Sequence, residues 1–296
     1  MRLLAWVRAS QAILFEASIA PACVGTAAAL AVGTAFVPLS FLLILVSLLG
    51  IQAGANLLKG YHEARDRSGS PSSPGSWIAF DSGAAVGLAR DPRNVLRVAW
   101  AFLILGIVAG LALVALTRSL LLLAFGVAGF VLAWSYSSPP LKLSYRGVGE
   151  LSTFLAFGPI MTVGSTVAFD PAGWRGSLLA SLILGFLAAS ISFSRYFPNE
   201  AEDRAKGKRT PVTILGRRPA AAFLLGLVWA AIGVAFLWWI LDGRFVWALV
   251  FVPPALGAIV ALPRGLAGRL SGAWTIGLTV LAHALAGLGL VLAFLL

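Results

Sequence analysis

Two polar segments of the sequence place possible metal ligands beside positive charges. Segment 195–218 contains Asn199 and Asp203, four residues apart and therefore on one face of the helix that we expect there. Basic residues follow within two helical turns, at Lys206, Lys208 and Arg209. Oxygen ligands can hold Mg²⁺, and lysine and arginine neutralise the phosphate oxygens that such an ion bridges. This pattern indicates a site for a metal-bound diphosphate, with an ordinary solvated loop of mixed charge as the alternative.

The second polar segment, 54–76, begins inside an apolar run. It contains the amide Asn56, and the acids Glu63 and Asp66 follow it. The stretch GSPSSPGS at 69–76 is rich in the residues that form turns and predicts a flexible or lid-like loop.

A third polar segment, 136–150, reads YSSPPLKLSYRGVGE and directly precedes an apolar run. It joins a Pro139-Pro140 turn to Lys142, Arg146 and Glu150. All three segments carry cations, and two of them carry clusters of carboxylates. We therefore expect the three segments to form the rim of one polar pocket.

The rest of the chain is too apolar to give a water-facing surface. Of its 296 residues, 59% are hydrophobic and 11% are charged, whereas a soluble domain carries about 25% charged residues. The composition therefore predicts an integral membrane protein. A single cysteine, Cys23, excludes an internal disulfide and, with only two histidines in the chain, disfavours a Cys or His metal site. We expect any metal to be held by oxygen.

Apolar runs of about 20 residues, enough to cross a bilayer as helices, recur along the whole chain. The continuation of the first run to about residue 36 favours a first span over a cleaved signal peptide. The sequence predicts an all-α, polytopic membrane protein with nine transmembrane helices. Gly106 and Gly110, at GxxxG spacing, predict close helix packing. The expected spans are 13–36, 38–58, 95–116, 119–136, 151–169, 177–197, 219–241, 245–262 and 272–295.

The basic residues lie almost entirely on one side of this arrangement. Of the 22 Lys and Arg residues, all but Arg118, Arg175 and Arg244 fall in the N-terminal segment and the even-numbered loops. The excess of Lys and Arg predicts that this side is cytoplasmic, with the N-terminus inside and the C-terminus outside. The cations are divided among short loops and have no interleaved aromatic platform on which bases could stack, so nucleic-acid binding is not supported. No internal inverted repeat indicates a transporter.

Glu16 and His283 are two of the ionisable residues that fall inside the expected spans. Glu16, near the cytoplasmic end of the first span, is either a functional carboxylate or one that reaches the interface. His283, in the ninth span, is interpreted as a helix-packing residue rather than as a base.

Together these segments resemble the UbiA superfamily of intramembrane aromatic prenyltransferases, in the branch that prenylates 1,4-dihydroxy-2-naphthoate for menaquinone. The resemblance covers nearly the whole chain and identifies 1–296 as one membrane domain. It implies nine helices around a central cavity, open to the cytoplasmic side of the cell membrane and laterally to lipid. The stretches that carry it are ASIAPACVGTA (17–27), ANLLKGYHEARDRSGS (55–70), SPGS (73–76), YSSPPLKLSYRGVGE (136–150), FLAFGPIMTVGS (154–165) and FPNEAEDRAKGKRTPVTILG (197–216).

The resemblance implies a Mg²⁺-dependent transfer of an isoprenoid chain from an allylic polyprenyl diphosphate to a small aromatic acceptor. Two Asp-rich motifs of the family hold Mg²⁺ on the diphosphate, the C–O bond ionises, and the acceptor attacks the allylic cation. Apolar walls protect such a cation from water. The residues expected at the metal are Asn56, Glu63, Asn199 and Asp203, those expected at the diphosphate are Lys59, Lys142, Arg146, Lys206, Lys208 and Arg209, and those expected beside the cation or acceptor are Tyr61 and Tyr136.

The sequence departs from the family pattern in both motifs. The first motif usually reads Asn-Asp-Tyr-x-Asp, and Lys59 and Gly60 stand here in place of its leading Asn-Asp pair. Asn199 replaces the leading Asp of the second motif, while Asp203 is retained. Lys59 could replace one metal ion as a fixed cation. The departures leave two alternatives open, a non-catalytic homologue that binds an isoprenoid lipid and a terpene cyclase or diphosphate-cleaving enzyme.

Overall fold

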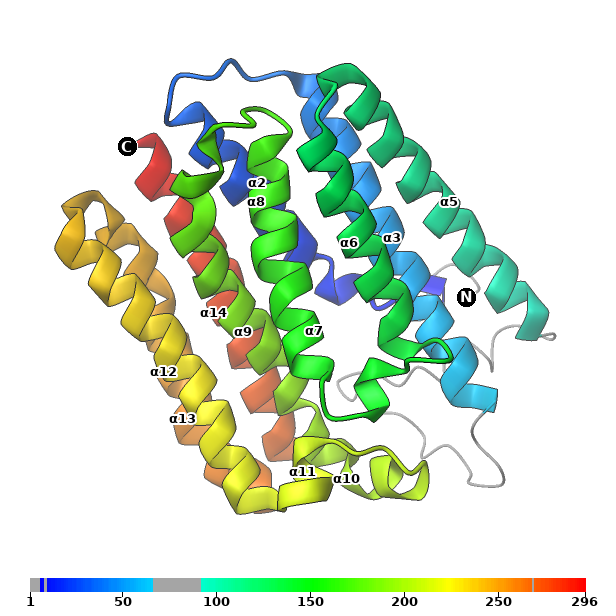
Figure 1. Ribbon diagram of the computed structural model, residues 1–296. Helices are drawn as coiled ribbons and strands as arrows, with labels where there is room; N and C mark the ends of the chain where they lie inside the picture. The colour runs from blue at the N-terminus through cyan, green and yellow to red at the C-terminus, as the bar shows by residue number, and fades with distance from the viewer. Residues whose placement is uncertain (1–5, 8–9, 66–91, 268) are drawn as a thin grey trace.

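The computed structural model describes the chain except residues 1–5, 8–9, 66–91 and 268 (Figure 1). The described part is helical in nearly all of its length, and no strand occurs in it. The description of side chains also leaves out residues 63–65, 92, 263–267 and 269–272.

Eight helical stretches of the described residues are long and apolar enough to cross a membrane. Large apolar side chains such as Leu111, Trp229 and Val260 are exposed on them, as expected for surfaces that face lipid rather than water. The predicted all-α, multi-pass membrane architecture is confirmed. The stretches are η1 (Ala12–Leu14) with α2 (Glu16–Leu30), α3 (Pro38–Arg65), α5 (Pro92–Thr117), α6 (Leu120–Ser137), η5 (Gly173–Ser177) with α9 (Leu178–Ser194), α12 (Arg217–Leu241), η6 (Gly243–Phe251) with α13 (Val252–Ala267), and α14 (Arg269–Leu295).

The span predicted at 151–169 is broken into three consecutive pieces. These are α7 (Gly149–Leu155), the π-helical turn η4 (Ala156–Ile160) and α8 (Met161–Val167). Pro159 lies inside the turn, where it has no N–H to donate to the α-helical ladder, so the turn widens. No piece alone is long enough to cross a membrane, and the predicted count of nine helices is therefore not confirmed.

Two short helices lie across one end of the bundle, α10 (Tyr196–Ala205) and α11 (Pro211–Leu215) (Figure 1). The short turn η3 (Leu143–Tyr145) follows α6. The predicted helix around Asn199 and Asp203 is present as α10, but it is not a continuation of the preceding span, because α9 ends at Ser194. The segment with the most chemistry-bearing residues is thus folded against the end of the bundle.

Helices α3 and α5 approach each other closely through glycine. A Cβ atom at Gly106 would lie 2.8 Å from the carbonyl oxygen of Ser47 and 2.9 Å from the amide nitrogen of Ile51. A Cβ atom at Gly50 would lie 2.9 Å from the carbonyl oxygen of Phe102. These contacts are with backbone, which cannot move aside, so the close packing expected from Gly106 is confirmed.

Replacing Gly106 by valine is expected to destabilise the protein by about 1–3 kcal/mol, because the new side chain forces α3 and α5 apart. The measurement is thermal unfolding in detergent. The matched control is Gly233→Val on α12, where a Cβ atom would meet nothing within 4 Å. An equal loss of thermal stability in the two variants would contradict the packing argument.

The first and last spans are joined by an intramembrane pair. Nδ1 of His283, which is fully buried in α14, contacts Oε1 of Glu16 at the start of α2. The interpretation of His283 as a packing residue fits this position, and Glu16 is engaged with it. The pair links α14 to α2.

Candidate active site

A cavity of about 370 Å³ opens among α3, α5, α6, the stretch from α7 to α8, and the end of α9. This volume falls within the usual range for small-molecule sites. Its walls are mostly leucine, isoleucine, valine, phenylalanine and glycine side chains. Its polar lining includes Asn56 and Lys59 in the second half of α3, Tyr136 at the end of α6, and Ser192 and Arg195 at the end of α9. These residues form the polar end of the cavity. The other polar residues that line it are Gln11, Ser47, Gln52, Ser152, Thr153 and Ser165.

Two cations reach this polar end from different helices. Lys59, near the end of α3, is 9% exposed, and its Nζ lies 6.0 Å from the centre of the Tyr136 ring. The Tyr136 hydroxyl lies 3.4 Å from Oγ of Ser192 in α9, and Arg195 follows directly after that helix. A positive charge inside an apolar cavity attracts an anion strongly, because little water screens it. The polar end is therefore suited to a polyanionic group.

The amides of α3 hold the N-terminal segment over this part of the cavity. Nδ2 of Asn56 donates to the carbonyl oxygen of Ser10 at 2.9 Å, and Nε2 of Gln52 donates to that of Leu14 at 2.9 Å. The Ser18 hydroxyl donates to Oε1 of Gln52 at 2.7 Å. The amide nitrogen of Asn56 is thus engaged in structure, and its side chain also lines the cavity.

The loop after α6 and the loop after α10 meet at Tyr145. The Nζ atoms of Lys142 and Lys208 lie 5.1 Å and 4.9 Å from the centre of its ring. The backbone N–H of Arg209 donates to the carbonyl oxygen of Tyr145 at 3.0 Å. Two of the three segments that we expected to share a rim are therefore in contact, whereas residues 66–76 of the third segment, 54–76, lie outside the described residues.

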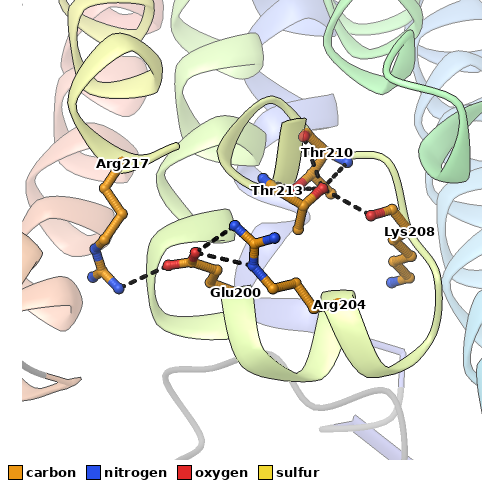
Figure 2. A network of polar contacts seen from close by, with 6 residues as sticks. All are labelled: Glu200, Arg204, Lys208, Thr210, Thr213 and Arg217. Carbon is orange, nitrogen blue, oxygen red and sulfur yellow. Dashed lines mark hydrogen bonds and ion pairs between the residues drawn. The ribbon is translucent and has the colours of Figure 1, made fainter. Parts of the chain in front are cut away.

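Asp203 and Lys208 form a buried ion pair beside this contact. Oδ1 of Asp203 lies 3.4 Å from Nζ of Lys208, and both side chains are less than a tenth exposed. The sequence GKRT builds the turn that brings the lysine back, because Gly207 adopts a positive φ of 67° and the Lys208 N–H donates to the Asp203 carbonyl oxygen at 2.8 Å. Thr210 then caps α11, and the hydroxyl of Thr213 donates to the Lys208 carbonyl oxygen at 2.8 Å (Figure 2).

The other acids of α10 point away from Asp203. Glu200 accepts hydrogen bonds from Arg204 and from Arg217 at the start of α12 (Figure 2). Glu202 pairs with Lys206 one helical turn away. Glu200 and Glu202 are therefore paired with basic residues other than Lys208. Lys206, a predicted diphosphate ligand, is held by the carboxylate of Glu202.

A buried tyrosine lies near Asp203 and Tyr136. Tyr196, at the start of α10, hydrogen-bonds through its hydroxyl to the carboxylate of Glu150 at the start of α7. Removal from water raises the pKa of Tyr196 well above 10, and the nearby Tyr136, Glu150 and Asp203 raise it further. Removal from water also raises the pKa of Glu150. Tyr196 is therefore a neutral donor at physiological pH and cannot serve as a base.

The predicted site residues divide into three groups. Asn56, Lys59 and Tyr136 line the cavity. Lys142, Asp203 and Lys208 form the cluster around Tyr145, and Arg209 joins that cluster through its backbone. Four predicted residues do not line the cavity: the guanidinium of Arg146 donates to the carbonyl oxygen of Pro140 in its own loop, Lys206 pairs with Glu202, Tyr61 packs on His62, and Asn199 is half-buried on α10. The side chain of Glu63 lies outside the described residues.

Sequence reasoning did not select Arg195, Gln52 or Ser192 as site residues. Each follows or interrupts an apolar run, and a polar group at such a position is costly unless it has a partner or a ligand. The cost of placing a polar group inside an apolar run is the feature of the sequence that points to these three residues as site residues.

The described side chains do not by themselves complete a metal site. They contain no group of three or more His, Cys, Asp or Glu that could hold an ion. Asp203 is a suitable hard oxygen ligand, but Lys208 already partners it. Asn56 and Asn199 could add amide oxygens, and Glu63, whose side chain lies outside the described residues, is the other predicted carboxylate ligand. The donor set is therefore poorer in carboxylates than Mg²⁺ usually requires.

Comparison with known proteins identifies the family. Residues 89–269 match the model of the UbiA prenyltransferase family. The chain belongs to this family of enzymes. The UbiA match spans the cavity walls from α5 to α9 and both loops that meet at Tyr145.

Curated UbiA relatives include two named 1,4-dihydroxy-2-naphthoate octaprenyltransferase. The one from Mycobacterium tuberculosis is 30% identical over 271 residues, which cover 89% of this chain and 88% of the relative. The one from Bacillus subtilis is 27% identical, and the match covers 68% of this chain but only 61% of the relative's length. A solved UbiA homologue from Archaeoglobus fulgidus, bound to GPP and Mg²⁺, has the same fold, with a TM-score of 0.58, 16% identity, and coverage of 97% of this chain and 99% of the homologue.

Proposed function

We propose that this UbiA protein transfers an isoprenoid chain from an allylic polyprenyl diphosphate to a small aromatic acceptor of the dihydroxynaphthoate kind. The observation that carries the proposal is the apolar cavity with Lys59 and Arg195 at its polar end. Such a cavity matches a substrate that has a hydrocarbon tail and an anionic head. The names of the relatives from Mycobacterium tuberculosis and Bacillus subtilis support the naphthoate acceptor.

In this reaction the bond between the first prenyl carbon and the diphosphate oxygen breaks, and the electron pair stays on the diphosphate. A ring carbon of the acceptor then forms the new C–C bond and loses the proton or carboxylate that it carried. Lys59 and Arg195 neutralise the charge that grows on the leaving diphosphate. The apolar walls exclude water, which would otherwise quench the allylic cation. The ring of Tyr136, next to Lys59, can face that cation.

We propose Mg²⁺ as the cofactor, with Asp203, Asn199, Glu63 and Asn56 as its protein ligands. When bound, the ion would add positive charge to the leaving diphosphate. Few carboxylates that could bind Mg²⁺ occur among the described residues, which agrees with a larger contribution of fixed cations to neutralising the diphosphate. Lys59 then supplies part of the positive charge that a metal ion bound by aspartates supplies in the family pattern. Lys142 and Lys208, which flank Tyr145, would neutralise the outer phosphate.

We also propose that the whole chain, 1–296, is one domain of the cell membrane with a cytoplasmic N-terminus. The asymmetry of Lys and Arg supports this orientation. It places α10, α11 and the polar end of the cavity on the cytoplasmic side, where a soluble diphosphate product can leave. Arg118, Arg175 and Arg244 then lie at the opposite side.

The test is an assay of purified protein with Mg²⁺, geranylgeranyl diphosphate and 1,4-dihydroxy-2-naphthoate. We expect release of pyrophosphate together with a prenylated naphthoquinol. Pyrophosphate release without acceptor would instead indicate a terpene cyclase or a diphosphate-cleaving enzyme. Absence of turnover across prenyl diphosphates and aromatic acceptors would overturn the proposal.

A non-catalytic homologue that binds an isoprenoid diphosphate is the second candidate. The absence of a carboxylate cluster among the described side chains favours it. The two candidates separate when Gly60→Asp and Asn199→Asp are combined. An enzyme adapted to its present residues should lose or change activity, whereas a non-catalytic protein should show none before the change.

A further inference from the structure

Helix α11 buries one face and exposes the other. Val212 is fully buried in a cluster with Phe197 of α10 and Leu224 of α12, whereas Ile214 and Leu215 are 52% and 55% exposed. Transfer of such aliphatic side chains from water to an apolar medium is favourable. Helix α11 therefore presents an apolar edge at the end of the bundle that it covers (Figure 1).

This apolar edge is continuous with exposed apolar residues at the start of α7. A Cβ atom at Gly147 would lie 3.6 Å from Cδ1 of Ile214, so Ile214 lies beside the residues that lead into α7. In that stretch Val148 and Leu151 are 40% and 58% exposed. A contiguous apolar surface of this kind marks a contact with another molecule or with lipid, whereas a single exposed residue does not.

On its other side α11 leads directly into a membrane span. Helix α12 begins at Arg217, Arg218 is exposed, and Phe223 is 52% exposed on the surface of α12. The exposed residues of α11 therefore lie near the point where α12 leaves the hydrocarbon region. Lipid headgroups, with their phosphates, lie at this depth.

Two exposed arginines flank α11, Arg209 before it and Arg218 after it. Among the carboxylates whose side chains the structure describes, none forms an ion pair with either arginine. The three acids of α10 are paired with other basic residues, Glu200 with Arg204 and Arg217, Glu202 with Lys206, and Asp203 with Lys208. The apolar edge is thus bordered by positive charge that these carboxylates do not neutralise.

We propose that the exposed edge of α11 binds an anionic phospholipid. Ile214 and Leu215 contact the upper part of its acyl chains, and the guanidinium groups of Arg218 and Arg209 bind its phosphate. A guanidinium group suits a phosphate because it can donate two parallel hydrogen bonds to it. Two positive charges favour a lipid with net negative charge over a zwitterionic one. This lipid site depends on the membrane location of the spans and not on the proposed reaction.

A lipid on α11 would also stabilise the turn that carries Lys208. The hydroxyl of Thr213 in α11 donates to the Lys208 carbonyl oxygen at 2.8 Å, and Thr210 caps the same helix. Lys208 in turn pairs with Asp203. We therefore expect an anionic lipid to raise the unfolding temperature of the protein more than a zwitterionic lipid does.

The experiment measures binding of phosphatidylglycerol and of phosphatidylcholine to the purified protein in detergent by native mass spectrometry, each at a series of concentrations. The wild-type chain should bind phosphatidylglycerol more tightly. Arg218→Gln should weaken phosphatidylglycerol by about fivefold, the effect of one arginine near an anionic lipid surface, and leave phosphatidylcholine unchanged. Arg218→Lys should retain most of the preference, because it keeps the charge. Leu215→Ser should weaken both lipids, because it removes apolar contact with the chains.

The matched control is Arg118→Gln, which removes one exposed positive charge at the opposite end of the bundle and should leave the preference unchanged. Thermal unfolding without added lipid should be the same for all variants, since each replaced side chain is exposed. Equal affinity of the wild-type chain for the two lipids, or equal effects of Arg218→Gln and Arg118→Gln, would overturn the proposal. Glycerol 1-phosphate has the headgroup phosphate without chains, and effective competition by it would also contradict a lipid site. Binding is measured without turnover, so a failure of prenyl transfer leaves this result unaffected.

Discussion

Replacing Lys59 by methionine is expected to lower kcat for prenyl transfer by about two to three orders of magnitude, the usual cost of removing one group that stabilises developing negative charge. Lys59 lies at the polar end of the cavity, is 9% exposed and has Tyr136 beside it. The charge on the diphosphate grows as the C–O bond breaks, so kcat should fall more than KM rises. Steady-state kinetics on geranylgeranyl diphosphate measures both.

Arg118→Met is the control for this change. It also removes one positive charge, but from the exposed connection between α5 and α6 at the opposite end of the bundle. We expect its kinetics to match those of the wild-type chain. If Lys59→Met retained wild-type kcat, the diphosphate would have to lie elsewhere, and the cluster around Tyr145 would become the principal site.

Replacing Asp203 by asparagine is expected to have two effects, because this carboxylate is both a buried ion-pair partner and the proposed metal ligand. Loss of the buried ion pair with Lys208, whose side chain is 9% exposed, should cost about 3–5 kcal/mol of stability. The Mg²⁺ concentration that stabilises the protein in the presence of a prenyl diphosphate should rise tenfold or more, since a hard anionic ligand is lost. Thermal unfolding with and without Mg²⁺ measures both effects.

Asp242→Asn is the matched substitution, because Asp242 pairs with Arg244 in an exposed loop at the other end of the bundle. It should change neither property. Lys208→Met separates the two roles of Asp203. If it reproduced the whole effect of Asp203→Asn, and the double variant lost no more than either single one, Asp203 would act only through its ion pair.

Much of the fold can be predicted, because the lengths of the apolar runs and the distribution of charged residues between them determine it. The runs at 38–58, 95–116 and 219–241 each become one helix near the predicted bounds, since about 20 apolar residues in a bilayer can satisfy their backbone only as a helix. The run at 151–169 shows that an apolar pattern does not predict a break inside a span. Its apolar residues indicate a span, but Pro159 turns part of it into a π-helical turn.

The candidate site is predictable in its segments and less so in its individual side chains. The pattern around Asn199 and Asp203 predicted a helix, and α10 is present there. Sequence cannot show which cations reach the cavity, because that depends on how the loop folds back at Gly207 and on where α9 ends. Arg195 lies at the cavity for this second reason, and Lys206 does not line it.

The pair of Glu16 and His283 has a consequence for how the protein is made. The two residues are 267 positions apart, so the carboxylate of α2 enters the bilayer long before its histidine partner has been synthesised. A carboxylate left alone in lipid is costly. The first span therefore reaches its final environment only when α14 inserts beside it. Synthesis and closure of the bundle are coupled, and a chain interrupted before α14 would leave that acid without its histidine.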